Sequence, residues 1–341
     1  MSDRPSRASN SVPRKLVIGM TYDLRDDYLR EGFSLEETAE FDKPDTIDAI
    51  ENALTAEGHR VERIGHVRSL MSRLSEGRRW DLVFNIAEGL SGFGREAQVP
   101  AVLDAYSIPY TFSDVLGQSI TLHKGITKHI VRDLGIPTPD FVVISDPDDL
   151  LSVNLAYPLF AKPVAEGTGK GISSRSKIDK AEDLKTTCLY LLKQFRQPVL
   201  LERYLPGREF TVGIVGTGGK ARALGAMEVL LNPEAEKHAY SYENKEFYEQ
   251  RVRYQLADDE EAGKAIDVSL AAWRGLNLKD AGRIDLRSDA DGTPNFIEVN
   301  SLAGLNPVHS DLPILCRLVG VPYERLISDI LASALARAGL A

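Results

Sequence analysis

The sequence is poor in several features that mark particular classes of protein. It has 2 cysteines in 341 residues, Cys188 and Cys316, which are far apart in apolar surroundings and fit neither a disulfide framework nor a metal-binding spacing. No apolar run reaches the roughly 18 residues of a membrane span, and the opening MSDRPSRASNSVPR lacks the apolar core of a signal peptide. We therefore expect a cytoplasmic protein without a membrane partner, in which residues 1–14 form a disordered tail.

An excess of positive charge is also absent. The formal net charge is −9, and the chain has no run rich in Lys and Arg, whereas proteins that bind nucleic acid usually present a basic face. This composition argues against a nucleic-acid partner and leaves small charged substrates open. The hydrophobic fraction of 43% and the charged fraction of 27% are ordinary for a globular protein, and the length predicts two or three domains.

Strand-like and helix-like segments alternate through the first third of the chain. Strands are expected at KLVIGMTY, HRVERIG and WDLVFNIAE, and helices at 45–57, 67–76 and 96–106. This alternation predicts a parallel sheet with helices on both faces, whose ligands would gather beyond the carboxyl ends of the strands. The acidic segment 33–45 is expected to be a mobile loop near that edge or, alternatively, a solvated surface.

The second unit begins near Gly117. Ser119 or Thr121 could cap a helix that continues to Leu134, and the strands FVVI, YPLFAKPV and PVLLERYL follow. Later segments predict further strands, a loop over 232–255, a helix over 259–275, a hairpin and one closing helix.

The hairpin carries the most informative polar residues. Asp291 and Gly292 lie between two strand-like segments and suit a two-residue type I′ turn, which would set Asp285 opposite Glu298. Asn300 would then point to the same face as both acids. Opposed carboxylates need neutralisation, and these oxygen ligands suit Mg²⁺, with Mn²⁺ as an alternative. An exposed acidic face is the other interpretation.

Two further motifs suit nucleotide binding. In FAKPVAEGTGKGISS, Lys162 ends a strand and a glycine-rich segment follows, whose backbone could approach a polyanion; a mobile surface hairpin is the alternative. In VLLERYLPGREFTVGI, Glu202 and Glu209 could accept hydrogen bonds from a nucleobase amine and a ribose, or they could pair with Arg203 and Arg208.

Together these motifs resemble a known family. Lys124, AKP…EGTGKGIS, LLERYLPGREFTV, YENK and GRIDLR…FIEVN…GL…HSDLP are similar to the ATP-grasp superfamily and, within it, to the D-alanine:D-alanine ligase family. The resemblance implies an N-terminal α/β domain over 15–117 and two α+β lobes, over 118–200 and 201–341, that clamp Mg-ATP. It also suggests a homodimer.

The resemblance also implies roles for individual residues. Lys124, Lys162 and Lys245 would contact ATP phosphates, and a loop with Glu166, Gly167, Thr168 and Gly169 would cover them. Glu202, Arg203 and Leu205 would bind adenine, and Glu209 the ribose. Asp285, Glu298 and Asn300 match the magnesium ligands, while Arg283 would stabilise the tetrahedral intermediate and Ser310 would receive a substrate carboxylate.

Departures from the family pattern lie around the amino-acid pocket. The first strand leads into TYDLRDDY instead of a glycine-rich stretch, and NIAEGLSGFGRE places Glu88 near an expected His. Glu37, Glu40, Asp42 and Glu88 are candidates for a substrate amine, with Glu88 first and a structural role as its alternative. His309 is either a packing neighbour of Ser310 or a substrate contact. D-alanine is therefore doubtful as both substrates.

Three functions follow from the sequence. The first is an ATP-dependent carboxylate:amine ligase that joins small molecules such as amino acids through an acyl phosphate. The second is a specialised ligase with substrates other than D-alanine, in metabolite or natural-product synthesis. The third is a nucleotide-binding regulator without turnover, which the combination of Arg283, Asp285, Glu298 and Asn300 disfavours.

Overall fold

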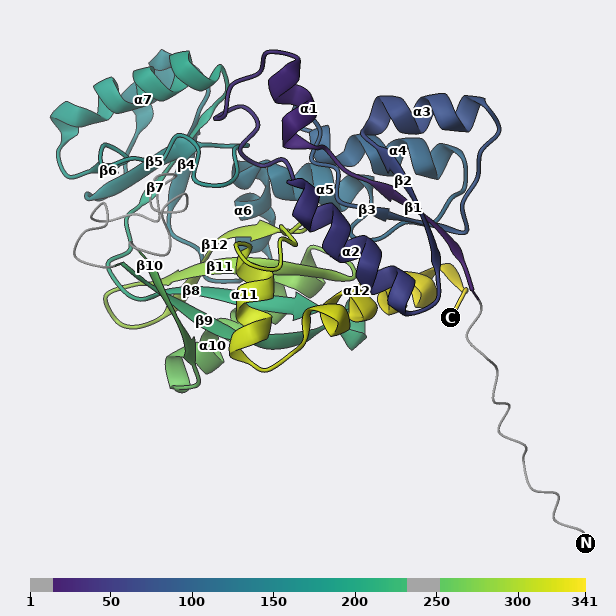
Figure 1. The fold of residues 1–341 in the computed structure, drawn as a ribbon. Helices are drawn as coiled ribbons and strands as arrows, with labels where there is room; N and C mark the ends of the chain where they lie inside the picture. Colours follow the sequence, from purple (N-terminus) through teal and green to yellow (C-terminus); the bar gives the residue numbers. More distant parts are fainter. Residues whose placement is uncertain (1–14, 232–251) are drawn as a thin grey trace, which may run out of the picture.

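The computed structural model describes residues 15–231 and 252–341, which form three β-sheets with helices packed against them (Figure 1). The expected tail, residues 1–14, and residues 232–251 of the expected loop lie outside the described residues. The rest of that expected loop was assigned wrongly, since a strand begins at Val252.

The first sheet is parallel, as predicted. Its order is β2 (Arg60–Gly65), β1 (Val17–Thr21) and β3 (Leu82–Asn85). Side chains alternate between its two faces, so that Ile18 and Met20 pack with α2 (Pro44–Ala56), whereas Val17 packs in the opposite core with residues of α3 (Val67–Ser75) and α4 (Gln98–Ala105). Both faces of the sheet are therefore covered by helices.

The segment that follows β1 is more structured than the predicted loop. It contains the short helix α1 (Arg25–Arg30), and Leu24 and Asp42 form a parallel bridge. Ala39 and Phe41 are buried, which excludes a fully solvated surface. Residues 38–42 of the segment instead pack against the molecule and carry Glu40 to its interior, whereas residues 34–37 and 43–45 are exposed.

The predicted helix of the second unit is two helices. α5 (Val115–Leu122) is capped by Asp114 and α6 (Lys124–Asp133) by His123, so the predicted caps Ser119 and Thr121 were wrong. The extended backbone of His123 separates the helices and places Lys124 in the first turn of α6.

The second sheet is antiparallel, with the order β4 (Phe141–Ile144), β7 (Val199–Arg203), β5 (Leu159–Pro163) and β6 (Lys177–Ile178). One face packs on α7 (Ala181–Phe195), whose Cys188 and Leu191 are buried in the core. The long connection between β5 and β6 contains the glycine-rich motif.

The third sheet is antiparallel, with the order β10 (Val252–Ala257), β9 (Arg222–Leu231), β8 (Glu209–Val215), β11 (Ala281–Ser288) and β12 (Pro294–Asn300). Its apolar face packs on α10 (Glu260–Gly275) through Phe210, Ile284 and Phe296. The opposite face carries the polar residues of the hairpin.

The expected closing helix is two helices, α11 (Asp311–Leu318) and α12 (Tyr323–Ala338). Figure 1 shows α12 returning to α2, where Ile327 and Ile330 join the same core as Ile18 and Phe84 of the first sheet. Short 3-10 helices occur at Arg95–Ala97, Pro147–Ser152 and Gly218–Lys220. Among the described residues, no helix combines the length and apolar character that crossing a membrane requires.

Candidate functional site

Two cavities meet at the polar face of the third sheet. A wide cavity of about 450 Å³ lies between the segments that follow β1 and β3, α6 and the segment after β12. A narrow cavity of about 90 Å³ lies between the second and third sheets. The residues predicted for the site line these cavities. Those in the wide one are Glu88, Lys124, Glu166, Gly167, Thr168, Arg283, Asn300, His309 and Ser310. Those in the narrow one are Lys162, Gly169, Glu202, Arg203, Leu205, Glu209, Asp285 and Glu298.

Strands β11 and β12 form the wall between the cavities. Asp285 pairs with Glu298, and Arg283 pairs with Asn300. Arg283 contacts Asp285 in a short ion pair, Asn300 donates to Asp285 at 3.3 Å, and Thr211 donates to its other oxygen at 2.8 Å. On each strand, a residue that lines the wide cavity is therefore two positions away from a residue that lines the narrow cavity.

The predicted pairing of Asp285 with Glu298 is confirmed, but the predicted turn is wrong. Ser288 lies opposite Pro294, so the loop is longer than two residues, and of its residues only Gly292 has a positive φ. A bulge then shifts the register between Asp285 and Leu286 by one residue. The longer loop and the bulge cancel, which is why a simple count from Gly292 reaches the correct pair.

Three buried lysines converge on Glu298 of this wall and on Glu202 of β7. Lys162 lies 3.0 Å from Glu202 and 3.5 Å from Glu298, while Lys124 lies 3.7 Å from Glu298. Lys128, which the sequence analysis missed, lies 2.8 Å from Glu202 and donates to the Phe296 carbonyl at 3.2 Å. Without an anionic partner, burial of these ammonium groups would be very unfavourable.

The neighbouring carboxylates stabilise the positive charge of the three lysines to different extents. Burial disfavours the charged form of Lys162, but Glu202 and Glu298 outweigh this and raise its pKa. Burial lowers the pKa of Lys124, which Glu298 offsets only in part, and lowers the pKa of Lys128 to about 8. Lys162 is therefore the most firmly charged of the three.

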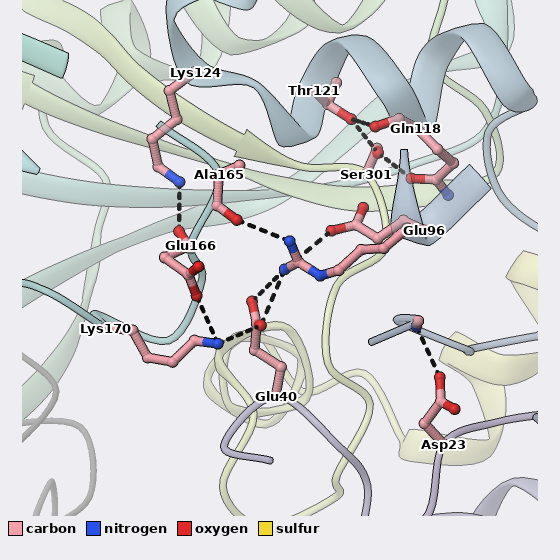
Figure 2. Close-up of polar contacts among 12 residues, drawn as sticks. Asp23, Glu40, Glu96, Gln118, Thr121, Lys124, Ala165, Glu166, Lys170 and Ser301 are labelled. Atoms are coloured by element: carbon pink, nitrogen blue, oxygen red, sulfur yellow. Dashed lines mark hydrogen bonds and ion pairs between the residues drawn. The ribbon is translucent and has the colours of Figure 1, made fainter. Parts of the chain in front are cut away.

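The glycine-rich segment folds over the wide cavity. Thr168 has φ 51°, a left-handed conformation that is strained for a β-branched residue, and Gly169 and Gly171 also have positive φ. Lys124 donates to the Glu166 carbonyl at 2.6 Å, which ties the start of the segment to α6 (Figure 2). The segment is thus a bent loop whose position depends on side chains outside it.

The segments that follow β1 and β3 contribute acidic groups to the wide cavity. Burial and the nearby carboxylates of Glu96 and Glu40 raise the pKa of Glu88 well above its ordinary value. Burial also raises the pKa of Glu96 to about 7 and, together with Asp23, the pKa of Asp42 to about 8. No hydrogen bond or salt bridge engages the Glu88 carboxylate within the described residues. A cationic group in this cavity would therefore meet carboxyl groups that could lose a proton and become negatively charged.

The far end of the wide cavity is formed by the residues that begin α11. Ser310 accepts a hydrogen bond from the Asn306 N–H at 3.0 Å, and His309 lines the cavity beside it. Asp311, a residue that the sequence analysis did not select, lies 3.5 Å from Arg283. Burial disfavours the charge on Arg283, but Asp285, Asp311 and Glu298 outweigh this and raise its pKa.

The narrow cavity combines apolar walls with a few polar groups. Glu202, the buried Leu205 and Arg203 are among the residues that line it. Glu209 pairs with Arg287 at 3.2 Å, not with the Arg208 considered from the sequence. Arg208 instead binds Glu228 and Glu261. An aromatic base with hydrogen-bonding edges fits such a slot.

Some residues of the site were not accessible to sequence reasoning. Lys128 follows Lys124 by one helical turn, and that spacing is its only signal in the sequence. Arg95 and Lys170 pair with Glu40 across more than fifty residues of sequence, which no local pattern indicates. Lys245 lies outside the described residues.

Asp285, Glu298 and Asn300 are the groups that could hold a divalent metal. Within the described ranges, no three His, Cys, Asp or Glu side chains are arranged to bind a metal ion. A set of two carboxylates and an amide is instead typical of Mg²⁺ that completes its coordination with water and substrate phosphates. Their common face, beside Lys162 and Lys124, fits such an ion.

Comparison with known proteins connects this geometry to one family. Residues 130–332 match the family model described as D-ala D-ala ligase C-terminus. A D-alanine–D-alanine ligase of Aquifex aeolicus is 33% identical over 285 residues, covering 83% of this chain and 92% of that protein. A Sinorhizobium fredii protein named uncharacterized protein y4sG is 30% identical over 294 residues, covering 83% and 85% of the two chains.

Solved structures support the same fold. A Bacillus anthracis D-alanine–D-alanine ligase complexed with ATP aligns with a TM-score of 0.71 at 22% identity and covers 95% of this chain and 99% of that one. The VanG D-Ala:D-Ser ligase of Enterococcus faecalis aligns with a TM-score of 0.71 at 17% identity, over 94% and 100% of the two chains. These likenesses concern the fold alone, and they confirm the ATP-grasp fold expected from the sequence.

Proposed function

This chain belongs to the D-alanine–D-alanine ligase family of ATP-dependent carbon–nitrogen ligases, and we propose that it joins the carboxylate of one amino acid to the amine of another through an acyl phosphate. The wall formed by β11 and β12 carries this proposal. Arg283 and Asn300 line the wide cavity, and Asp285 and Glu298 line the narrow one. A nucleotide in the narrow cavity would thus present its terminal phosphate to a carboxylate in the wide cavity.

The first step would transfer the γ-phosphoryl group to the substrate carboxylate. A carboxylate oxygen forms a bond to the γ-phosphorus, the bond from phosphorus to the β,γ-bridging oxygen breaks, and ADP leaves. Lys162 and Lys124 flank Glu298 at 3.5 and 3.7 Å, where their charges would spread over the phosphate oxygens. Phosphoryl transfer relies mainly on such positioning and electrostatic stabilisation.

The second step would form the amide. The amine attacks the acyl carbon, a proton leaves the nitrogen, and the phosphate departs with the oxygen that came from the carboxylate. Arg283 projects into the wide cavity, where its guanidinium would stabilise the oxyanion of the tetrahedral intermediate. Asp285 and Asp311 hold this group charged and in place.

We propose that Mg²⁺, or Mn²⁺ in its place, is held by Asp285, Glu298 and Asn300. When bound, the ion would neutralise phosphate charge and act as a Lewis acid toward a phosphoryl oxygen. The donor set supports this assignment because all three side chains project from one face of paired strands.

Amino acids are the proposed substrates, since the names of similar proteins specify D-Ala and D-Ser. The acidic wall of the wide cavity favours substrates other than a pair of D-alanines. Glu88 would bind a substrate ammonium group, and Ser310 and His309 would receive a substrate carboxylate; all three line the wide cavity. A specialised ligase is therefore the second candidate function. Homodimerisation and a cytoplasmic location stay predictions from the sequence.

A panel of D- and L-amino acids, tested in pairs with Mg-ATP, would test this function. We expect phosphate release and a condensed product detected by mass in the presence of one class of pair. Glu298→Gln should abolish both while leaving the unfolding midpoint near that of the parent protein. ATP binding without stimulation by any pair in a broad panel would contradict the ligase and favour a nucleotide-binding regulator.

A further inference from the structure

The glycine-rich loop is fastened to the N-terminal part of the chain by a chain of ion pairs. Glu40, in the segment after α1, lies 2.9 Å from Arg95 and 3.0 Å from Lys170 of the loop. Lys170 also lies 2.6 Å from Glu166, and Arg95 donates to the Ala165 carbonyl at 2.8 Å. Figure 2 shows the Lys170 ammonium between the carboxylates of Glu40 and Glu166. Arg95 and Glu40, which lie outside the second sheet, therefore contact the loop before its first turn, at Ala165, and at the end of that turn, at Lys170.

The central groups of this network are buried. The side chains of Arg95, Glu40 and Lys170 are 7%, 10% and 10% exposed. Glu166 is the second carboxylate beside Lys170, and Glu96 lies 4.0 Å from Arg95. Burial favours the neutral form of Glu40, but Arg95 and Lys170 outweigh this and lower its pKa. Loss of one member would leave an uncompensated buried charge, which is strongly unfavourable.

Gly167 gives an independent indication that Glu40 and the loop fit closely. A Cβ atom at position 167 would overlap the Oε1 atom of Glu40. The φ of Gly167 is not in the left-handed range, so the backbone itself does not require glycine there. A side chain at position 167 would therefore displace the Glu40 carboxylate, which approaches the loop backbone there.

The same N-terminal segment forms a wall of the wide cavity. Its neighbours Ala39, Phe41 and Asp42 line that cavity together with Glu40. One short segment thus contacts the space proposed for the amino-acid substrates and the loop proposed for the ATP phosphates.

We propose that Glu40 is a positioning residue which, held by Arg95, fixes Lys170 and so makes the phosphate loop and the wall of the amino-acid cavity move as one unit. This inference rests on the proposed function for the meaning of the two spaces. Occupation of the amino-acid cavity would then favour the closed loop, and reciprocally ATP would favour a closed amino-acid cavity. Closure of both would exclude water from an acyl phosphate.

Glu40→Gln, Lys170→Met and the double variant test the network. Two measurements are needed: hydrogen exchange of the loop amides without substrates, and the Kd and KM for Mg-ATP. Lys170 N–H donates to the Gly167 carbonyl at 2.9 Å and Ile172 N–H to the Gly169 carbonyl at 3.0 Å, so these amides report on loop order. Asp48→Asn and Lys264→Met are matched controls, because each removes a charge from an exposed ion pair away from the site.

We expect each single variant to raise the loop exchange rates and the Kd for Mg-ATP by about tenfold, which corresponds to about 1.4 kcal/mol. The double variant should be no worse than the singles, since all three break the same link. Lys170→Arg should restore the parent values to within about twofold because it keeps the charge, and the controls should change nothing.

Parent-like loop exchange in both single variants would overturn the inference. So would faster exchange spread equally over α7 and the loop, because the ion pairs would then support stability in general. The exchange measurement needs no turnover. If the parent protein forms no product with any amino-acid pair, the proposed function fails while the loop measurement still decides whether Glu40 fixes the loop.

Discussion

Glu202 and Lys128 form a buried ion pair whose members differ in how many opposite charges they contact. Their side chains are 4% and 0% exposed. Glu202 has two cationic partners, Lys128 at 2.8 Å and Lys162 at 3.0 Å. Lys128 has one carboxylate partner and the Phe296 carbonyl at 3.2 Å. Neutralising each member in turn should therefore have unequal effects on stability.

Lys128→Met should be the milder change. Glu202 keeps Lys162, and the Phe296 carbonyl keeps the hydrogen bond that Thr138 donates at 2.8 Å. The expected loss is about 1.5–3 kcal/mol, the range for a hydrogen bond to a charged group. Glu202→Gln leaves Lys128 without a carboxylate, which should cost about 3–5 kcal/mol. Lys162 is less affected because Glu298 lies 3.5 Å away.

The loss of stability in Glu202→Gln should change with pH in one direction. Burial lowers the pKa of Lys128 to about 8 even though Glu202 opposes the shift. Without Glu202 the pKa falls further, so the native variant releases a proton that the unfolded chain still holds. Stability then rises with pH wherever the unfolded state binds more protons. The deficit of Glu202→Gln relative to the parent should therefore shrink as pH rises toward about 8.

Thermal unfolding at pH 6 and pH 8.5 measures both effects. The midpoint of Glu202→Gln should lie below that of Lys128→Met by several degrees at pH 6, since about 1 kcal/mol shifts the midpoint by roughly 2–4 °C in a domain of 150–250 residues. A Lys128→Met variant at least as unstable as Glu202→Gln would refute this reasoning. A deficit of Glu202→Gln that is the same at both pH values would refute the proton release.

Three further outcomes are expected. Burial raises the pKa of Asp42 to about 8, so the native protein keeps a proton that the unfolded chain loses near pH 4. The free energy of unfolding should therefore fall as pH rises from about 4 to about 8. Asp42→Asn should flatten this slope in thermal unfolding. Arg283→Met should lower kcat by on the order of 10²-fold or more, with a smaller change in the KM for ATP. A change in the KM for ATP as large as the change in kcat would contradict a role for Arg283 in the reaction. A chelator should abolish ATP-dependent product formation, with recovery on addition of Mg²⁺ or Mn²⁺; full activity in its presence would exclude the metal.

The parts of the site that follow regular strand geometry could be predicted from the sequence. Side chains alternate along β11 and β12, so Asp285, Glu298 and Asn300 were expected on one face, and Asp285 pairs with Glu298 as expected. The turn itself was not predictable to the residue, because the bulge depends on how β12 packs and leaves no mark in the local sequence.

Contacts that join distant segments could not be predicted. Glu40 belongs to an acidic segment that suits a solvated loop, whereas Arg95 and Lys170 make its burial favourable. Likewise, the amphipathic pattern of α12 predicts a helix but does not identify the first sheet as its packing partner. Tertiary contacts decide both cases, and a single sequence without the fold does not contain them.

Isotope transfer tests the central claim that carboxylate and nucleotide meet across the wall of β11 and β12. The active amino acid would be labelled with ¹⁸O in its carboxylate, and the inorganic phosphate released with Mg-ATP would be analysed by mass. We predict one ¹⁸O atom per phosphate released with product, because the carboxylate oxygen leaves with the phosphoryl group. Product formation with unlabelled phosphate would contradict the acyl-phosphate route.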